Sequence, residues 1–198
     1  MIIAEPLKYA PFEWLDHVQR EGLVFARPIL DDLGISPVQQ TRIDSQEVAA
    51  HLATPRDEPA VANPLAFLQS VLGWPVNRIA GAPGGPSLPE LATLALPELD
   101  TVLSADLALI DTRAEDRVLL LVRTEEAGTD PDARGVLDGW EASPQQRFER
   151  LLRESGVEVG ILFSDLQLRL VYAPRGETAG WIGWPLHDLT SVAGRSML

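Results

Sequence analysis

The chain has 198 residues, which is enough for one large domain or two small ones with a substantial core. Its content of 45% hydrophobic and 23% charged residues is typical of a folded soluble domain, and the lack of Cys excludes disulfides and thiolate metal sites. The formal net charge of −13 argues against a protein that grips DNA by itself through a broad basic face.

The sequence also argues against a membrane segment and a histidine metal site. No apolar run approaches the ~20 residues of a membrane-spanning helix, and the first residues lack the pattern of a secretory signal. His17, His51 and His187 lie far apart and form no i, i+4 pair of the kind that binds zinc on a helix. We therefore expect a cytoplasmic protein with no membrane partner.

The first half of the chain is predicted to be mainly helical. Apolar spacing and capping residues predict three helices, over residues 11–22, 44–52 and 63–73. The third is the best marked, because Asn63 can cap it, Pro64 suits its first position and Gly73 can end it. Residues 23–30 are predicted to be extended. The segment Gly81–Pro89 is predicted to be a plain connecting loop, since its glycines do not follow a strand and open a helix as phosphate-binding loops do.

The second half is predicted to form a sheet. Apolar runs predict five strands, over residues 106–112, 117–124, 157–164, 166–173 and 180–186. A helix over 143–156 carries a capping box of Ser143 and Gln146, with Gly156 as its stop. Residues 125–142 are predicted to be a loop, and residues 187–192 are predicted to add a final helical turn.

These elements predict a mixed α/β (α+β) fold. A helical lead-in, residues 1–90, is expected to pack on a central mixed β-sheet flanked by helices, residues 91–198, in one compact domain. Trp181 and Trp184, three residues apart in one predicted strand, should point to opposite faces of that sheet.

Several segments carry a resemblance that covers nearly the whole chain. They include FEWLDHVQREGLVFARPIL, FLQSVLGWP, LLLVRTEEAGTDPD and, as the most specific part, residues Ser143–Leu186. In this order they resemble the amino-terminal region of large bacterial adenine-specific DNA methyltransferases from Type IIG-like restriction–modification and phage-defence systems. The resemblance implies a PD-(D/E)XK nuclease-like domain that precedes a methyltransferase domain. The methyltransferase needs an Asn-Pro-Pro-aromatic motif, whereas Asn63-Pro64 is followed here by Leu65, so we expect a front module that is not an enzyme on its own.

The nuclease pattern implied by the resemblance has an Asp at the start of one strand and Glu-x-Lys on the next, which hold Mg²⁺ and activate water. Asp106 occupies the Asp position, Arg123 the acid position and Glu125 the lysine position, so the last two charges are inverted. Three arrangements stay open: a two-carboxylate metal site of Asp106 and Glu125, an ion pair between Asp106 and Arg123, or exposed unpaired charges. Mg²⁺ is expected as a cofactor only in the first.

Four arginines are candidates for contact with nucleic acid. Arg147, Arg150 and Arg153 share one side of the helix over 143–156, and Arg175 lies in a Pro/Gly turn between two strands. The competing interpretation is a solvated helix face and a solvated turn residue.

The first functional hypothesis is an inactive nuclease-like module that assists DNA engagement or docks to a methyltransferase domain or another subunit of a defence system. DNA binding by such an acidic chain alone should be weak. The alternatives are an active Mg²⁺-dependent endonuclease that uses Asp106 and Glu125, and a pure protein-interaction domain with no role on DNA.

Overall fold

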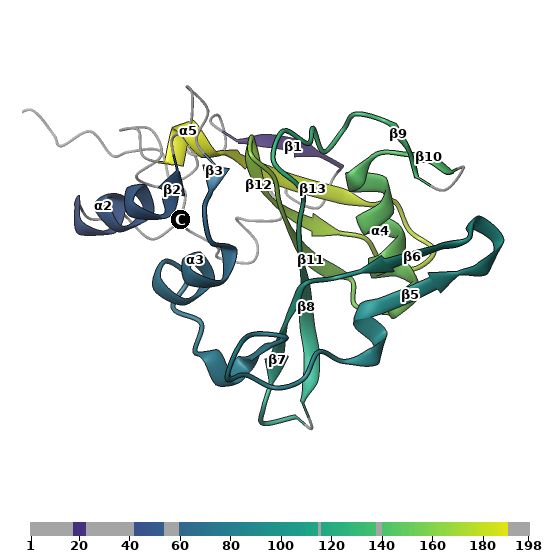
Figure 1. Ribbon diagram of the computed structural model, residues 1–198, viewed down its shortest axis with the longest axis horizontal. Helices are drawn as coiled ribbons and strands as arrows, with labels where there is room; N and C mark the ends of the chain where they lie inside the picture. Colours follow the sequence, from purple (N-terminus) through teal and green to yellow (C-terminus); the bar gives the residue numbers. More distant parts are fainter. Residues whose placement is uncertain (1–17, 23–41, 54–59, 115, 138–139, 190–198) are drawn as a thin grey trace, which may run out of the picture.

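The computed structural model of the chain describes residues 18–22, 42–53, 60–114, 116–137 and 140–189. Within these ranges the protein is a mixed α+β structure built on a seven-stranded sheet (Figure 1). The predicted central mixed sheet with helices on its faces is therefore confirmed at this level. None of the helices in these ranges is long and apolar enough to cross a membrane.

The sheet runs from the earliest described strand at one edge to a two-residue strand at the other. Its strands, in spatial order, are β1 (Gln19–Glu21), β13 (Gly180–Pro185), β12 (Gln167–Tyr172), β11 (Val159–Phe163), β8 (Arg117–Thr124), β7 (Leu107–Asp111) and β4 (Ile79–Ala80). Neighbouring strands are antiparallel except for β8 and β11, which run parallel with Leu121 opposite Gly160. A parallel pair needs a crossover connection, and a helix between the two strands supplies it.

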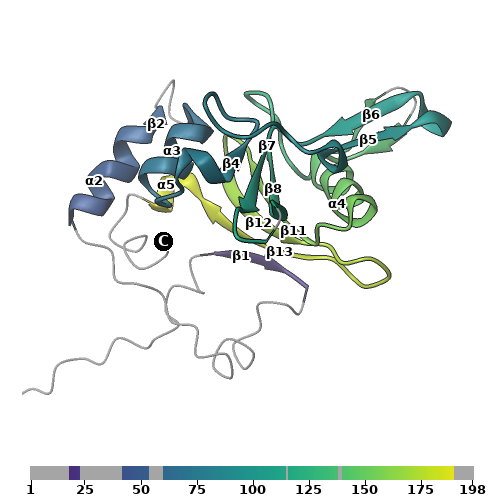
Figure 2. The same cartoon turned by 90° about the horizontal axis from the view of Figure 1, so that it is seen from below.

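The remaining elements are short. The helices are α2 (Arg42–His51), α3 (Pro64–Ser70), α4 (Pro144–Ser155) and α5 (Leu186–Leu189), with 3₁₀ turns η2 (Val76–Arg78), η3 (Glu90–Ala92) and η4 (Pro97–Leu99). Three two-stranded ribbons pair β2 (Leu52–Ala53) with β3 (Ala60–Val61), β5 (Thr93–Leu96) with β6 (Thr101–Ser104), and β9 (Gly135–Leu137) with β10 (Trp140–Ala142). The β5–β6 ribbon lies alongside α4, whereas α2, α3 and α5 gather at the other side of the sheet (Figure 2).

Helix α4 forms where its sequence signals place it. The Ser143 hydroxyl accepts from the Gln146 amide at 3.2 Å, the Gln146 side chain accepts from the Ser143 amide at 3.0 Å, and Gly156 ends the helix at φ 75°. Its apolar face buries Phe148, Leu151 and Leu152. Local interactions alone thus define where the crossover helix α4 begins and where it ends.

Two apolar clusters cover the two faces of the sheet. The α4 face buries Leu121, Leu162 and Trp181 together with the apolar side chains of the helix. The opposite face packs Val122 and Phe163 against α2, α3 and α5. Trp181 belongs to the first cluster and Trp184 packs against the second, so their predicted opposite orientation is confirmed. The adjacent residues Leu121 and Val122 of β8 are buried on opposite faces, which accounts for the apolar second half of this strand.

The structure differs from the sequence prediction in several short elements. Residues 19–21 form strand β1 rather than the end of a helix, because they pair with β13; the rest of that predicted helix and the extended segment 23–30 lie outside the described residues. The predicted loop 125–142 contains the β9–β10 ribbon. The β5–β6 ribbon was not predicted, and the loop Gly81–Pro89 follows strand β4, although it opens no α-helix. Both edge strands of the sheet thus come from the first 90 residues.

Candidate functional site

Asp106, Arg123 and Glu125 meet at one end of the antiparallel pair β7–β8. Asp106 directly precedes β7, Arg123 belongs to β8, and Glu125 follows two residues later. The register of the pair places Leu107 opposite Val122, which brings the start of β7 next to the end of β8. The three charged positions that the motif predicted are therefore close together in space.

The Arg123 guanidinium lies between the two carboxylates. Its Nε is 3.3 Å from Glu125 Oε1, and its Nη1 is 3.8 Å from Asp106 Oδ1. Nη1 also donates to the Ser104 carbonyl at 3.0 Å, and the Thr124 amide donates to Asp106 Oδ2 at 2.7 Å. Of the arrangements left open by the sequence, an ion-paired cluster is the one present. Because Asp106 is 44% exposed, its pair with Arg123 should stabilise the fold by only ~0–1 kcal/mol.

These residues do not fit a Mg²⁺ site. A magnesium site needs carboxylate oxygens that face the ion, with any fixed cation kept away. Here a fixed cation contacts both carboxylates, and within the described ranges no three His, Asp or Glu side chains gather as metal ligands do. The lysine position carries Glu125, so the group that would help to activate water is also lacking at that position. We derive no metal-dependent step at this site.

A hollow of about 80 Å³ opens beside Arg123, between β6, the end of β8 and the first half of α4. Its polar lining is Ser104, Arg123, Glu125 and Arg147, and its apolar lining includes Phe148 of the core. The hollow therefore combines two cationic side chains and one carboxylate with a partly apolar wall. The sequence pattern singled out Arg123 and Glu125 but not the contribution of the β5–β6 ribbon.

The four candidate arginines are not equivalent. Three of them form ion pairs: Arg150 with Glu98 at 2.5 Å, Arg153 with Glu149 at 3.4 Å and Arg175 with Glu154 at 3.5 Å. Arg175 also donates to the carbonyls of Arg153 and Glu154, so it caps the end of α4 from its turn. Arg147 donates instead to the Gly135 carbonyl at 2.6 Å. Arg147 therefore differs from the other three candidates, because within the described residues it bonds to a neutral carbonyl and forms no ion pair.

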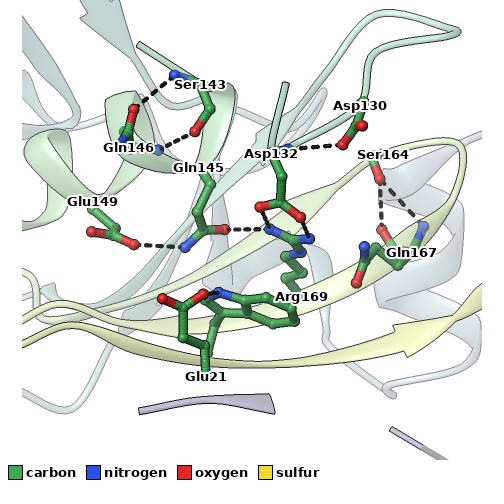
Figure 3. A network of polar contacts seen from close by, with 11 residues as sticks. Glu21, Asp130, Asp132, Ser143, Gln145, Gln146, Glu149, Ser164, Gln167 and Arg169 are labelled. Carbon is green, nitrogen blue, oxygen red and sulfur yellow. Dashed lines mark hydrogen bonds and ion pairs between the residues drawn. The ribbon is translucent and has the colours of Figure 1, made fainter. Parts of the chain in front are cut away.

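A buried arginine that the motif analysis did not single out organises the loop that leaves this site. Arg169 of β12 has a fully buried side chain, and its two terminal nitrogens donate to Asp132 Oδ1 and Oδ2 at 2.7 and 2.5 Å (Figure 3). It also donates to Gln145 Oε1 at 3.3 Å, and its guanidinium lies 3.8 Å from the centre of the Trp181 ring. An arginine inside the apolar run of β12 was the only sequence signal for this network.

The network of Arg169 joins β12 to four other parts of the fold: the loop after β8, the start of α4, β13 and β1. The Gln145 amide donates to the Pro131 carbonyl at 3.0 Å, which ties the first turn of α4 to the loop. The Trp181 indole donates to Glu21 at 3.1 Å, which ties β13 to β1. The loop that starts at Glu125 is held by these contacts, so the network helps to position the edge of the site.

Acid is expected to remove the contribution of Asp132 to stability. The hydrogen bond from Arg169, aided by its positive charge and partly opposed by burial, lowers the pKa of Asp132. This contribution is therefore complete above the unfolded-state pKa of about 3.9 and is lost as the pH falls through the folded-state value. The difference in urea midpoint between the wild type and Asp132→Asn should be constant above about pH 5 and shrink below about pH 4. A difference in urea midpoint that persists unchanged at about pH 2 would contradict this prediction.

Comparison of this chain with protein-family models, curated proteins and solved structures gives no match. Chemically, the cluster of Asp106, Arg123 and Glu125 can hold charge and accept or donate hydrogen bonds. The neighbouring hollow adds a second cation, Arg147, with which a small anion could interact.

Proposed function

We propose that this protein is a non-cleaving, nuclease-like module of a bacterial DNA restriction–modification or phage-defence methyltransferase. Its role is to assist DNA engagement or to dock onto a methyltransferase domain or partner subunit. The observation that carries this proposal is the position of Arg123, whose guanidinium contacts both Asp106 and Glu125 where a nuclease of this kind would hold a metal ion.

The arrangement of the elements supports a PD-(D/E)XK-like core. Strands β7 and β8, helix α4 and strand β11 occur in this order in the chain, with the β9–β10 ribbon between β8 and α4, and the connection that contains α4 joins the parallel strands β8 and β11. Asp106 and the pair Arg123 and Glu125 lie at one end of β7 and β8, as the motif requires. The order of the elements and the position of these residues support the proposal of a nuclease-like core, while the charges at those positions do not suit hydrolysis.

The charge of the chain favours assistance or docking over an independent grip on DNA. The net charge is −13, and the carboxylates of Glu98, Glu149 and Glu154 neutralise three of the four candidate arginines. An acidic surface is better suited to a basic partner than to the phosphate backbone. Contact with DNA would then be local and would depend on a partner for most of its affinity.

A plasmid-nicking assay tests this proposal. Incubation of supercoiled plasmid with the protein and Mg²⁺ or Mn²⁺ should give no more nicking than buffer, and Asp106→Asn should change nothing. The double variant Arg123→Glu/Glu125→Lys restores the acid and lysine of the pattern and should gain a Mn²⁺-dependent rise in melting temperature that the wild type lacks. Metal-dependent nicking by the wild type that is lost in Asp106→Asn would instead establish an active endonuclease.

A further inference from the structure

Arg147 carries a charge that the fold leaves available. Within the described residues it forms no ion pair, and its Nη2 donates to the Gly135 carbonyl. Its Nε is buried and has no hydrogen-bond partner in that part of the chain. Within the described residues the guanidinium is thus held by one neutral acceptor, and its charge is not neutralised by a carboxylate.

Arg147 and Arg123 line the same hollow. Glu125 is the only carboxylate among the lining residues. Asp106 contacts Arg123 from outside the lining, so both carboxylates lie at Arg123 and none pairs with Arg147 within the described residues. At about 80 Å³ the hollow has room for several water molecules, or for one group of the size of a phosphate.

Both guanidinium groups are fixed before any ligand arrives. The Ser104 carbonyl and Glu125 hold Arg123, while the Gly135 carbonyl holds Arg147. The Trp140 ring, whose centre lies 5.9 Å from the Arg147 guanidinium carbon, supports the second group further. A ligand therefore binds to side chains that have already lost part of their freedom, which lowers the entropic cost of binding.

We propose that this hollow binds a phosphodiester group, as found in the DNA backbone, through Arg123 and Arg147 and without a metal ion. Because Asp106 and Glu125 balance the two arginines, the hollow accepts a monoanionic diester with less repulsion than a dianionic monoester, and the planar donors of arginine suit phosphate oxygens. This inference rests on the proposed function, which brings DNA to this edge of the sheet. The α4 N-terminus takes no part, because the amides of Gln145 and Gln146 already donate to Pro131 and Ser143.

The first test uses dimethyl phosphate, a small monoanionic diester, with the full chain in EDTA. Titration should shift the side-chain Nε–H resonances of Arg123 and Arg147 in a saturable way, and inorganic phosphate at neutral pH should bind more weakly. Arg147→Gln should weaken binding about tenfold. Arg147→Lys keeps the charge but loses the planar pair of guanidinium donors, so it should have an intermediate effect.

Arg150→Gln is the matched control. Arg150 lies one turn further along α4 and also approaches the Trp140 ring, at 5.3 Å, but it pairs with Glu98 and does not line the hollow. Both changes remove one positive charge, so a non-specific electrostatic effect would be equal in the two variants. A loss confined to Arg147→Gln supports the site. Equal losses, or no saturable shift in the wild type, overturn it.

The second test uses a fluorescent 12-base-pair duplex in EDTA at low salt, followed by anisotropy. Arg147→Gln should weaken binding more than Arg150→Gln and reduce the slope of log K against log salt by about 0.9, as expected for one lost phosphate contact. If dimethyl phosphate binds the hollow but the duplex responds equally to both variants, DNA is overturned as the source of the diester. Neither result depends on plasmid nicking, which alone decides whether the module cleaves DNA.

Discussion

Asp132→Ala is expected to lower the free energy of unfolding by about 2–3 kcal/mol, because it leaves the Arg169 guanidinium buried without its counter-charge. Arg169 is fully buried, and Asp132 supplies two of its hydrogen bonds. The estimate lies below the ~3–5 kcal/mol seen when a fully buried pair is broken, since Asp132 itself is 57% exposed and water can partly replace it. Urea denaturation followed by circular dichroism measures the change.

Two variants give this prediction its controls. Glu126→Ala removes an exposed acid from the same loop and should change stability by less than about 0.5 kcal/mol. Asp132→Ala combined with Arg169→Met removes both charges and should recover much of the loss, because an apolar side chain tolerates burial. If Asp132→Ala proves no worse than Glu126→Ala, the pair does not stabilise the fold.

Phe148→Ala is expected to cost about 3–5 kcal/mol. Phe148 is 2% exposed, lies on the buried face of α4 and also lines the hollow beside Arg123. Its loss leaves a cavity between α4 and β11, where the Phe148 ring packs against Gly160. Thermal and urea denaturation measure the loss, and Val136→Ala, at a side chain that is 73% exposed, is the control that should have little effect.

Gly160 provides an independent check on that packing. A Cβ at Gly160 would lie 2.7 Å from Phe148 Cε1, so Gly160→Ala forces the aromatic ring to move. Alone it should destabilise by about 1–3 kcal/mol, and in a Phe148→Leu background by clearly less. Additive effects of the two changes would show that the ring does not press on this glycine.

The elements that the sequence predicted correctly are those whose signals are local. Helix α4 has a capping box, a first-turn Pro and a terminal Gly, and all of them act within a few residues. Strand β11, and strand β8 at Leu121 and Val122, are buried on both faces, which favours continuous apolar runs. Such features depend little on the rest of the fold, which is why they can be read from the sequence.

The elements that the sequence did not predict are short strands formed by pairing. Strand β1 has three residues whose pattern suits a helix end equally well, and only its pairing with β13 selects the extended form. The β5–β6 ribbon has four residues on each side, too few for alternation to stand out. In these places tertiary context decides between conformations that the local sequence leaves nearly balanced.

In the candidate site, too, some contacts could be predicted from the sequence and others depend on tertiary structure. The motif positions Asp106, Arg123 and Glu125 come close together because β7 and β8 pair antiparallel, although the pairing shifts register between Leu109 and Ile110. The motif did not reveal which carboxylate Arg169 would meet. Asp132 lies 37 residues from Arg169 in the chain, and no local pattern connects them.

Strand β1 has a consequence for the order in which the protein assembles. Its partner is β13, and the bond between Glu21 and Trp181 joins residues 160 positions apart. Closing so long a loop is slow and is favourable only once the partner strand is in place. During synthesis on a ribosome, the earliest described strand must therefore wait until almost all of the described chain has emerged. The edge of the sheet that is translated first is completed last.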